Sequence, residues 1–175
     1  MAVMFALVLA GCTSSSSSEE SYGAPTGSTA ADGTTIVELS GLSFTIPKGF
    51  DVVTARAGVI ATNTSNEQVK VYVSATDGSL TRMYEGEYPR DWLKKLVDTY
   101  GTSTAKTVGK TSYGDVDYQD INGIDFAVKS GVAEKDGTTS HVVVYGGYSD
   151  QKEIVVITVT AAESDMALDV AKSMK

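Results

Sequence analysis

The chain has 175 residues, which fits one globular domain at roughly 100 to 200 residues per domain. Hydrophobic residues make up 42% of it and charged residues 21%, so it is too apolar for a wholly disordered chain. A formal net charge of −8 argues against nucleic-acid binding, and a single cysteine and a single histidine exclude an internal disulfide and a multi-cysteine or histidine-rich metal site.

The N-terminus has the pattern of a secretory signal. Residues 2–10 form an uncharged apolar run of nine residues, the length of a signal-peptide core and about half of a membrane span. The run ends in Leu9-Ala10-Gly11-Cys12, which resembles the lipobox of bacterial lipoproteins. The resemblance implies cleavage before Cys12 and diacylglycerol on its sulfur, and the alternative is an ordinary buried cysteine. Because residues 1–5 lack Lys and Arg, we expect the natural start to lie upstream.

A polar segment follows the cysteine. Among residues 13–35, 15 of 23 are Ser, Thr or Gly and none is basic. Such a segment buries too little apolar area to offset its ordering entropy, so we expect a flexible tether with a span of roughly 25 Å. We therefore divide the chain into a signal peptide (residues 1–11), the lipidated Cys12 with its tether (residues 12–35) and a single α+β domain (residues 36–175).

The domain begins with a pattern of period two, which is typical of half-buried strands. Residues 42–46 and residues 69–74 each place apolar side chains at alternate positions. Further strands are predicted at residues 124–128, 140–148 and 153–161, joined by short turns into an antiparallel meander.

Particular residues refine this meander. Asn122-Gly123 favours a type I′ turn, because both residues tolerate positive φ. The pair Gly146-Gly147 inside a strand indicates a bulge or a close backbone approach. Residues 153–161 have no polar face, so we expect that strand to be central and covered on both sides.

Two segments have helical spacing instead. Residues 92–100 carry one apolar stripe, with Pro89 suited to the first turn and Gly101 to the C-cap. Residues 166–174 carry Met or Val at every fourth position. The predicted fold is therefore α+β, an antiparallel sheet of about six strands packed with two amphipathic helices.

The order of these elements resembles a known family. Residues 42–50, Leu-Ser-Phe-Thr-Ile-Pro-Lys-Gly-Phe, are similar to the opening F-x-I-P-x-G-W/F strand of the PsbP-like superfamily. A hairpin, an amphipathic helix, a segment like residues 121–123, a long meander and a C-terminal helix follow in that superfamily's order, over most of residues 36–175. The superfamily includes an extrinsic photosystem protein, a Ran-binding nuclear import factor and envelope lipoproteins of the DcrB and LpqN types. The resemblance implies a PsbP-like sandwich acting as an adaptor or binding module, and it transfers no catalytic residue.

An aromatic cluster supplies the candidate partner-binding residues. Tyr84, Tyr88 and Trp92 lie among charged residues just before and within the first predicted helix. Tyr and Trp are enriched at binding hot spots. Because Trp92 falls on the helix's apolar stripe, we assign it to the core and propose Tyr84 and Tyr88 as a partner-binding surface.

Two other features have simpler interpretations. The single histidine, His141, begins a strand and has no Ser, Cys or Asp partner at a catalytic spacing, which favours a surface position. An oxygen-rich stretch could chelate Ca²⁺ but does not match the EF-hand spacing, so a solvated loop and turn is favoured. Its members are Asp115, Asp117, Asp120, Asn122 and Asp125.

Two function classes remain after this survey. The first is a non-catalytic binding or adaptor module, anchored by acyl chains on the extracytoplasmic face of a bacterial cell membrane, with an envelope protein, a glycan or a lipidic ligand as partner. It is favoured because no catalytic, metal or cofactor constellation is found. The alternative is a small envelope hydrolase that uses carboxylates such as Glu85 and Glu87. A deep pocket with buried carboxylates would favour this alternative.

Overall fold

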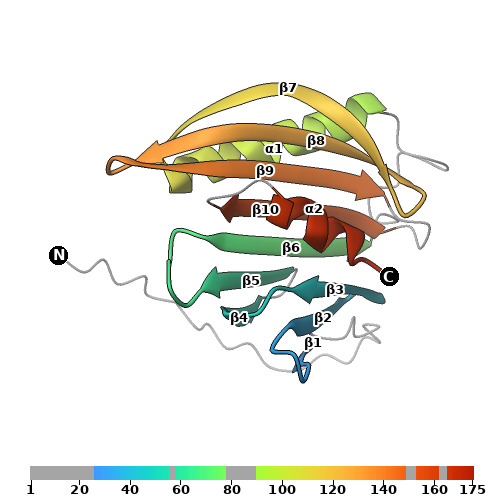
Figure 1. The fold of residues 1–175 in the computed structure, drawn as a ribbon. Helices are drawn as coiled ribbons and strands as arrows, with labels where there is room; N and C mark the ends of the chain where they lie inside the picture. The colour runs from blue at the N-terminus through green and yellow to red at the C-terminus, as the bar shows by residue number, and fades with distance from the viewer. Residues whose placement is uncertain (1–25, 56–57, 78–89, 149–152, 162–164) are drawn as a thin grey trace, which may run out of the picture.

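The computed structural model describes residues 26–55, 58–77, 90–148, 153–161 and 165–175. These residues form ten strands in two sheets, with antiparallel pairing throughout, and two helices (Figure 1). The small sheet has the order β1 (Thr26–Thr29), β2 (Thr35–Leu39), β3 (Leu42–Ile46). The large sheet has the order β4 (Phe50–Ala55), β5 (Gly58–Asn63), β6 (Lys70–Asp77), β10 (Glu153–Ala161), β9 (Thr138–Tyr148), β8 (Ile124–Lys135), β7 (Lys110–Ile121). The helices are α1 (Arg90–Val108) and α2 (Asp165–Lys172).

The predicted α+β class with an antiparallel meander and two helices is confirmed, although about six strands was an undercount. The strands that the sequence pattern missed are β1, β2, β4, β5 and β7. β10 lies in the middle of the seven-stranded sheet, and its residues from Ile154 onward are buried, as the unbroken apolar run predicted.

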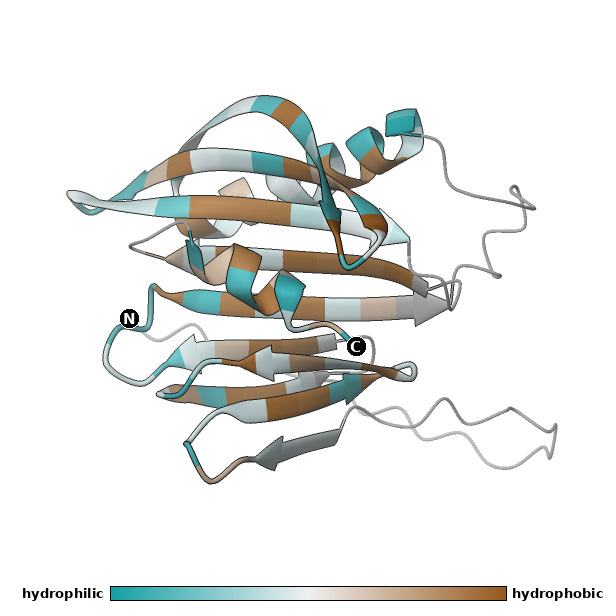
Figure 2. Cartoon of the chain, turned by 45° about the vertical axis from the view of Figure 1, so that its right-hand side comes forward, coloured by the Kyte–Doolittle hydropathy of each residue, from teal (hydrophilic) through white to brown (hydrophobic). Residues whose placement is uncertain are grey.

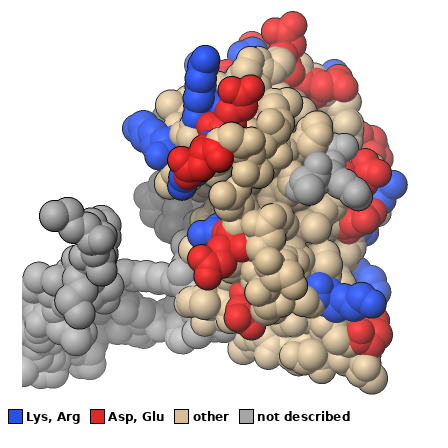
Figure 3. All heavy atoms as spheres, turned by 60° about the vertical axis from the view of Figure 1, so that its left-hand side comes forward, with Lys and Arg blue, Asp and Glu red and all other residues tan. Residues whose placement is uncertain are grey.

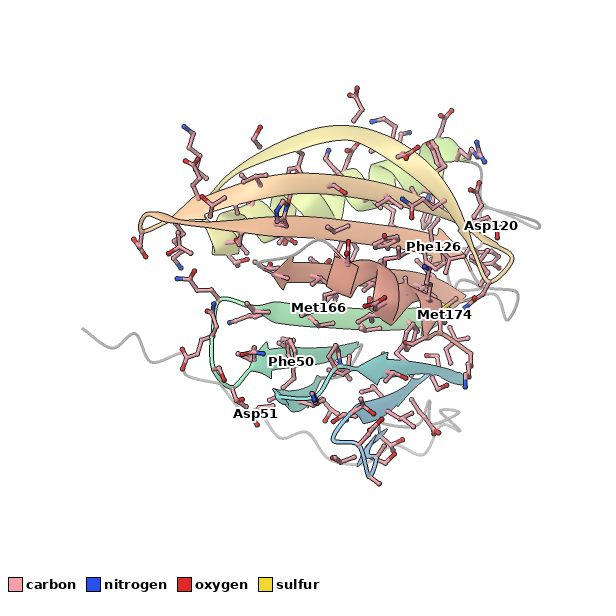
Figure 4. All side chains as sticks on the ribbon, in the orientation of Figure 1. Phe50, Asp51, Asp120, Phe126, Met166 and Met174 are labelled. Carbon is pink, nitrogen blue, oxygen red and sulfur yellow. The ribbon has the colours of Figure 1, made fainter. Side chains whose placement is uncertain are left out.

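The two faces of the large sheet are covered differently. One face packs against α2 and the small sheet, and together they enclose the main core. Met166 and Met174, at the C-terminal end of the chain, and Phe126 of β8 all belong to or pack against this core (Figure 4). Hydrophobic residues run along the middle of β9 and β10 and also occur in the strands of the small sheet and in α2 (Figure 2).

On the opposite face, α1 packs over β8 and β9, with fewer contacts to β7 and β10. Leu93 and Val97 of α1 form a second, smaller core with residues of β8, β9 and β10. α1 has its principal contacts with β8 and β9, and no helix among the described residues lies over β4, β5 and β6 on this face (Figure 1).

The tether boundary was placed too late in the chain. Thr26–Thr29, assigned to the tether, form β1 and pair with β2. The turn between the two strands is closed by Asp32, whose carboxylate accepts hydrogen bonds from the Thr34 amide at 3.0 Å and hydroxyl at 2.7 Å. All four residues of β1 are exposed, so the strand carries no apolar alternation that a sequence pattern could reveal.

The first helix is longer than predicted, since it continues past Gly101 to Val108. Gly101 is buried within the helix, where the Tyr113 hydroxyl donates to its carbonyl at 3.0 Å and an added Cβ would lie 3.4 Å from the Lys129 side chain. The helix ends instead before Gly109, whose φ of 108° suits a glycine. Gly101 is therefore a buried position inside the helix and not a C-cap.

The predicted turn and glycine pair are both found. Asn122 and Gly123 have φ of 56° and 81°, as a type I′ hairpin turn requires. At Gly146, an added Cβ would lie 2.8 Å from Val97 of α1, and at Gly147 it would lie 2.5 Å from the Phe126 ring. The pairing of β9 with β10 runs through both glycines without a register shift, so they allow a close approach and are not a bulge.

The last residues complete the small sheet. The backbone of Lys175 exchanges two hydrogen bonds with Ser43 of β3, at 2.9 and 3.1 Å. The Asn122 amide group donates to the carbonyls of Lys172 and Met174, which joins this tail to the β7–β8 turn. Among the described residues, neither helix is long and apolar enough to cross a lipid bilayer.

Candidate functional site

Several of the predicted site residues lie outside the described residues. These are Cys12, Tyr84 and Tyr88, together with Glu85 and Glu87 of the hydrolase alternative. Trp92 lies among the described residues and packs, half-buried, against the second core under α1. It therefore belongs to the apolar stripe of the helix, as predicted, although its side chain is not fully buried.

The acidic stretch is part of a sheet. Asp115, Asp117 and Asp120 lie in β7 and Asp125 lies in β8, so the expected loop is wrong except for the turn at Asn122. Asp120 accepts a hydrogen bond from the Gly123 amide near the β7–β8 turn (Figure 4). No group of three or more His, Cys, Asp or Glu side chains with metal-binding geometry occurs in the described part of the chain.

Asp125 has a partner of its own. Arg90, the first residue of α1, donates to it from Nε at 2.7 Å and from Nη2 at 3.3 Å. The Arg90 guanidinium also lies 4.7 Å from the centre of the Tyr118 ring, and the Tyr118 hydroxyl donates to the Arg90 carbonyl. This cluster fixes the start of α1 on β7 and β8. His141 is exposed on β9, as predicted.

A concave surface lies beside α1. It is a groove of about 710 Å³ between the C-terminal half of α1 and the neighbouring strands β5, β6 and β10. We call it the α1 groove. Its wall on α1 is formed by Tyr100, Ser103, Thr104, Thr107 and Val108, and its floor by Ile60, Lys70, Tyr72, Thr158 and Thr160. The volume falls within the range of roughly 300 to 1,000 Å³ that is usual for small-molecule sites.

The sheet register explains how the floor is exposed. Directly paired residues form one row across this face, and burial rises along it from the edge strand to the strands under α1. Val53 is 64% exposed, Ile60 is 41% exposed, Tyr72 is half-buried and Val144 is fully buried. The row runs through Val53, Ile60, Tyr72, Thr158, Val144, Lys129 and Val116.

The composition of β10 changes where the groove begins. On the α1 face, Ile154 and Val156 pack in the second core, and the next two positions on that face are Thr158 and Thr160. On the opposite face, every alternate position from Val155 to Ala161 is apolar. Thr158 is 7% exposed, and its hydroxyl makes no hydrogen bond with any described residue. A buried hydroxyl without a hydrogen-bond partner destabilises the fold. An apolar side chain at position 158 would avoid this cost, so the threonine is not explained by packing of the strand alone.

Two tyrosines lie where the wall meets the floor. The rings of Tyr72 and Tyr100 stack with 6.5 Å between centroids and 24° between planes. Burial raises the pKa of Tyr100 above its ordinary value, and the neighbouring Tyr72 adds to this effect. Tyr100 is therefore uncharged at neutral pH and keeps its proton as a hydrogen-bond donor.

The hydroxyls on α1 are already oriented. Thr104 donates to the Tyr100 carbonyl and Thr107 to the Thr104 carbonyl, both at 2.8 Å. Because each hydroxyl proton is held by the helix, the oxygen lone pairs remain available as acceptors.

The end of the groove beyond α1 is charged. Lys70 of β6 and Lys135 of β8 line it together with Gln68 and Ser140, and Glu67 is the one carboxylate among its described lining residues. The end of the molecule that holds the β5–β6 and β8–β9 turns carries acidic and basic side chains among uncharged surface (Figure 3). Among the described lining residues, two lysines against one glutamate give this end of the groove a positive balance of charge.

The sequence pattern did not find the α1 groove. The lining residues come from five separate strands, from the C-terminal half of α1 and from the turn before β6, so no local spacing joins them. The one local signal is the replacement of Ile and Val by Thr158 and Thr160 on alternate positions of β10. Because Ile157, Val159 and Ala161 surround these two threonines, the strand as a whole still has the pattern of an apolar strand.

Comparison with known proteins identifies the fold. No family model matches the sequence, and no curated protein matches it. The solution structure of cyanobacterial PsbP (CyanoP) from Synechocystis sp. PCC 6803 is similar, with a TM-score of 0.55 and 10% identity over 92% of this chain and 97% of that chain. A crystal structure from Bacteroides thetaiotaomicron VPI-5482 has a TM-score of 0.48 and 11% identity over 78% of this chain and 45% of that chain, too distant a likeness to carry an argument. This chain therefore has a PsbP-like fold.

Proposed function

We propose that this protein is a lipid-anchored, non-catalytic binding module of the bacterial cell envelope and that it binds its partner or ligand in the α1 groove. Acyl chains on Cys12 hold it at the extracytoplasmic face of the membrane, and residues 13–25 separate the anchor from β1. Since two acyl chains give durable anchoring where one does not, a diacylglycerol is sufficient.

The observation that supports a binding role is the composition of the α1 groove. It has aromatic, hydroxyl and cationic side chains, as ligand sites commonly do. A carboxylate-based hydrolase needs two carboxyl groups flanking one bond. Among the described lining residues Glu67 is the one carboxylate, so the groove favours binding over hydrolysis.

The anchor is tested by metabolic labelling. The wild-type chain should incorporate a palmitate analogue and sediment with membranes, and Cys12→Ala should do neither. Undiminished labelling of Cys12→Ala would contradict the lipoprotein assignment.

The binding site is tested by photocrosslinking in intact cells. A photoreactive residue replaces Ile60, which is 41% exposed in the groove floor, or Ile36, which is 38% exposed on the small sheet. The two positions match in residue type and exposure, so they differ chiefly in location. Crosslinked products specific to position 60 are expected. Equal yields at both positions, or none at position 60, would contradict binding in the groove.

A further inference from the structure

We infer that the ligand of the α1 groove is an anionic saccharide, a sugar ring that carries a carboxylate or a phosphate. The inference rests on the proposed binding function and names its chemical class of ligand. It is drawn from the side chains that line the groove and from the order in which they occur along it.

The hydroxyl groups argue for a polar, many-hydroxyl ligand. Ser or Thr residues supply six of the lining side chains, contributed by α1, β9 and β10. The Thr104 and Thr107 hydroxyls donate to the helix backbone and so present acceptor lone pairs, which match the O–H groups of a sugar. An acyl chain would leave these groups desolvated and unpaired, which is costly.

Thr158 supplies an independent observation. Its side chain is more than nine-tenths buried, lies in the groove floor and has no hydrogen-bond partner among the described residues. It is the direct neighbour of Tyr72 on the adjacent strand. A ligand hydroxyl in the groove floor would give the Thr158 hydroxyl the hydrogen-bond partner that it lacks.

Two parts of the groove indicate how the ligand is oriented: an apolar surface that suits the sugar ring and lysines that suit its anionic group. Tyr72 and Ile60 are paired neighbours on β6 and β5, and together they form an apolar surface on which the C–H face of a sugar ring can pack. Lys70 lies two residues before Tyr72 on the same strand and face, and Lys135 lies at the same end of the groove. An anionic group on the sugar would meet the Lys70 ammonium group next to Tyr72, with a charge-assisted hydrogen bond, and Lys135 adds positive charge further along this end.

The test is calorimetric titration of the full chain, purified in detergent, with three probes. Trigalacturonate carries the predicted chemistry, and its methyl ester keeps the sugar rings but removes the charge. Vesicles of phosphatidylglycerol and phosphatidylcholine present anionic headgroups without the sugar. We expect trigalacturonate to bind at least about 5-fold more tightly than the ester, and its affinity to fall as salt is raised.

Variants locate the site. Lys70→Gln is expected to weaken trigalacturonate binding about 2-fold to 5-fold, as for an exposed ion pair, and Tyr72→Ala more. Lys95→Gln, an exposed lysine of α1 outside the groove, is the matched control and should change nothing. Because Lys70 is exposed, its variant should fold normally, which melting curves would verify.

The outcomes separate the two proposals. Equal affinity for trigalacturonate and its ester, binding to the vesicles alone, or equal effects of Lys70→Gln and Lys95→Gln would overturn the saccharide inference. If crosslinking at position 60 still succeeds in cells, the binding function stands with another ligand. If crosslinking also fails, both proposals fall.

Discussion

Replacement of Gly147 by alanine tests how tightly the main core is filled. Gly147 lies in β9 opposite Val155, and a Cβ there would meet Phe126 Cε1, Cδ1 and Cζ at 2.5, 2.6 and 2.9 Å. The Phe126 ring is fully buried and packs edge to face with Tyr145 at 6.2 Å, so it has little room to retreat. Alanine at this position therefore forces the ring or the strand to shift.

The size of the effect follows from opposing terms. Overpacking a core costs typically about 1 to 3 kcal/mol, and replacing a glycine inside a strand returns about 0.5 to 1 kcal/mol. We expect Gly147→Ala to lose about 1 to 2 kcal/mol net, or roughly 2 to 8 °C in melting temperature for a domain of this size. Urea and thermal unfolding followed by circular dichroism would measure it.

Two further variants make the reasoning refutable. Gly27→Ala in β1 meets nothing closer than 3.7 Å and should stay within about 0.5 kcal/mol of wild type. In a Phe126→Leu background, the cost of Gly147→Ala should shrink, because the two sites are in contact. A Gly147→Ala protein as stable as wild type, or the same cost with and without the Phe126 ring, would show that the ring does not confine this glycine.

Three other predictions concern the chain boundary, an ion pair and the aromatic cluster. Mild proteolysis should leave a fragment that begins no later than Thr26, as mass spectrometry would show. A stable product that starts near residue 35 would mean that β1 is not stably paired with β2. Hydrogen bonds from Lys129 and Lys94 lower the pKa of Asp98 below its ordinary value of 3.8. The ionised carboxylate therefore stabilises the fold fully above about pH 4, and this stabilisation is lost as the pH falls through the lowered pKa. The free energy of unfolding of Asp98→Asn should fall less steeply in acid than that of the wild type, and an equal fall would contradict this. Since Trp92 is half-buried, Trp92→Ala should cost less than the roughly 3 to 5 kcal/mol of a fully buried indole, while Tyr84→Ala and Tyr88→Ala should cost within about 1 kcal/mol and weaken partner capture; unfolding of either tyrosine variant as severe as that of Trp92→Ala would assign these tyrosines to the core.

The parts of the fold that the sequence predicted are those with an apolar face. Residues 42–46 carry apolar side chains at alternate positions, and residues 153–161 carry them at most positions, because both strands contribute to the main core. The sequence pattern therefore predicted both strands. β7 was missed because it is an edge strand with one buried residue, Ile121, in twelve. Its polar residues look like a loop, although they pair along β8 with a single irregularity after Tyr113.

The candidate site could not be predicted in the same way. Lys70 and Tyr72 become neighbours of Thr158 and Thr160 only when β6 pairs with β10, more than eighty residues later in the chain. Gly101 misled the helix boundary for a related reason, since its role depends on Tyr113 and Lys129 from other strands. Long-range pairing, and not local spacing, creates the α1 groove.

The position of β10 has a consequence for the order of folding. β10 joins the unit β4-β5-β6 to the unit β9-β8-β7, yet it follows all six of those strands in the chain. Until residues 153–161 are available, β6 and β9 each have an unpaired edge, and the tail that pairs with β3 comes later still. Closing the sheet requires contacts of long sequence separation, which slows folding. We therefore expect the large sheet to close only after residues 153–161 have been synthesised, so that its two halves stay separate until then.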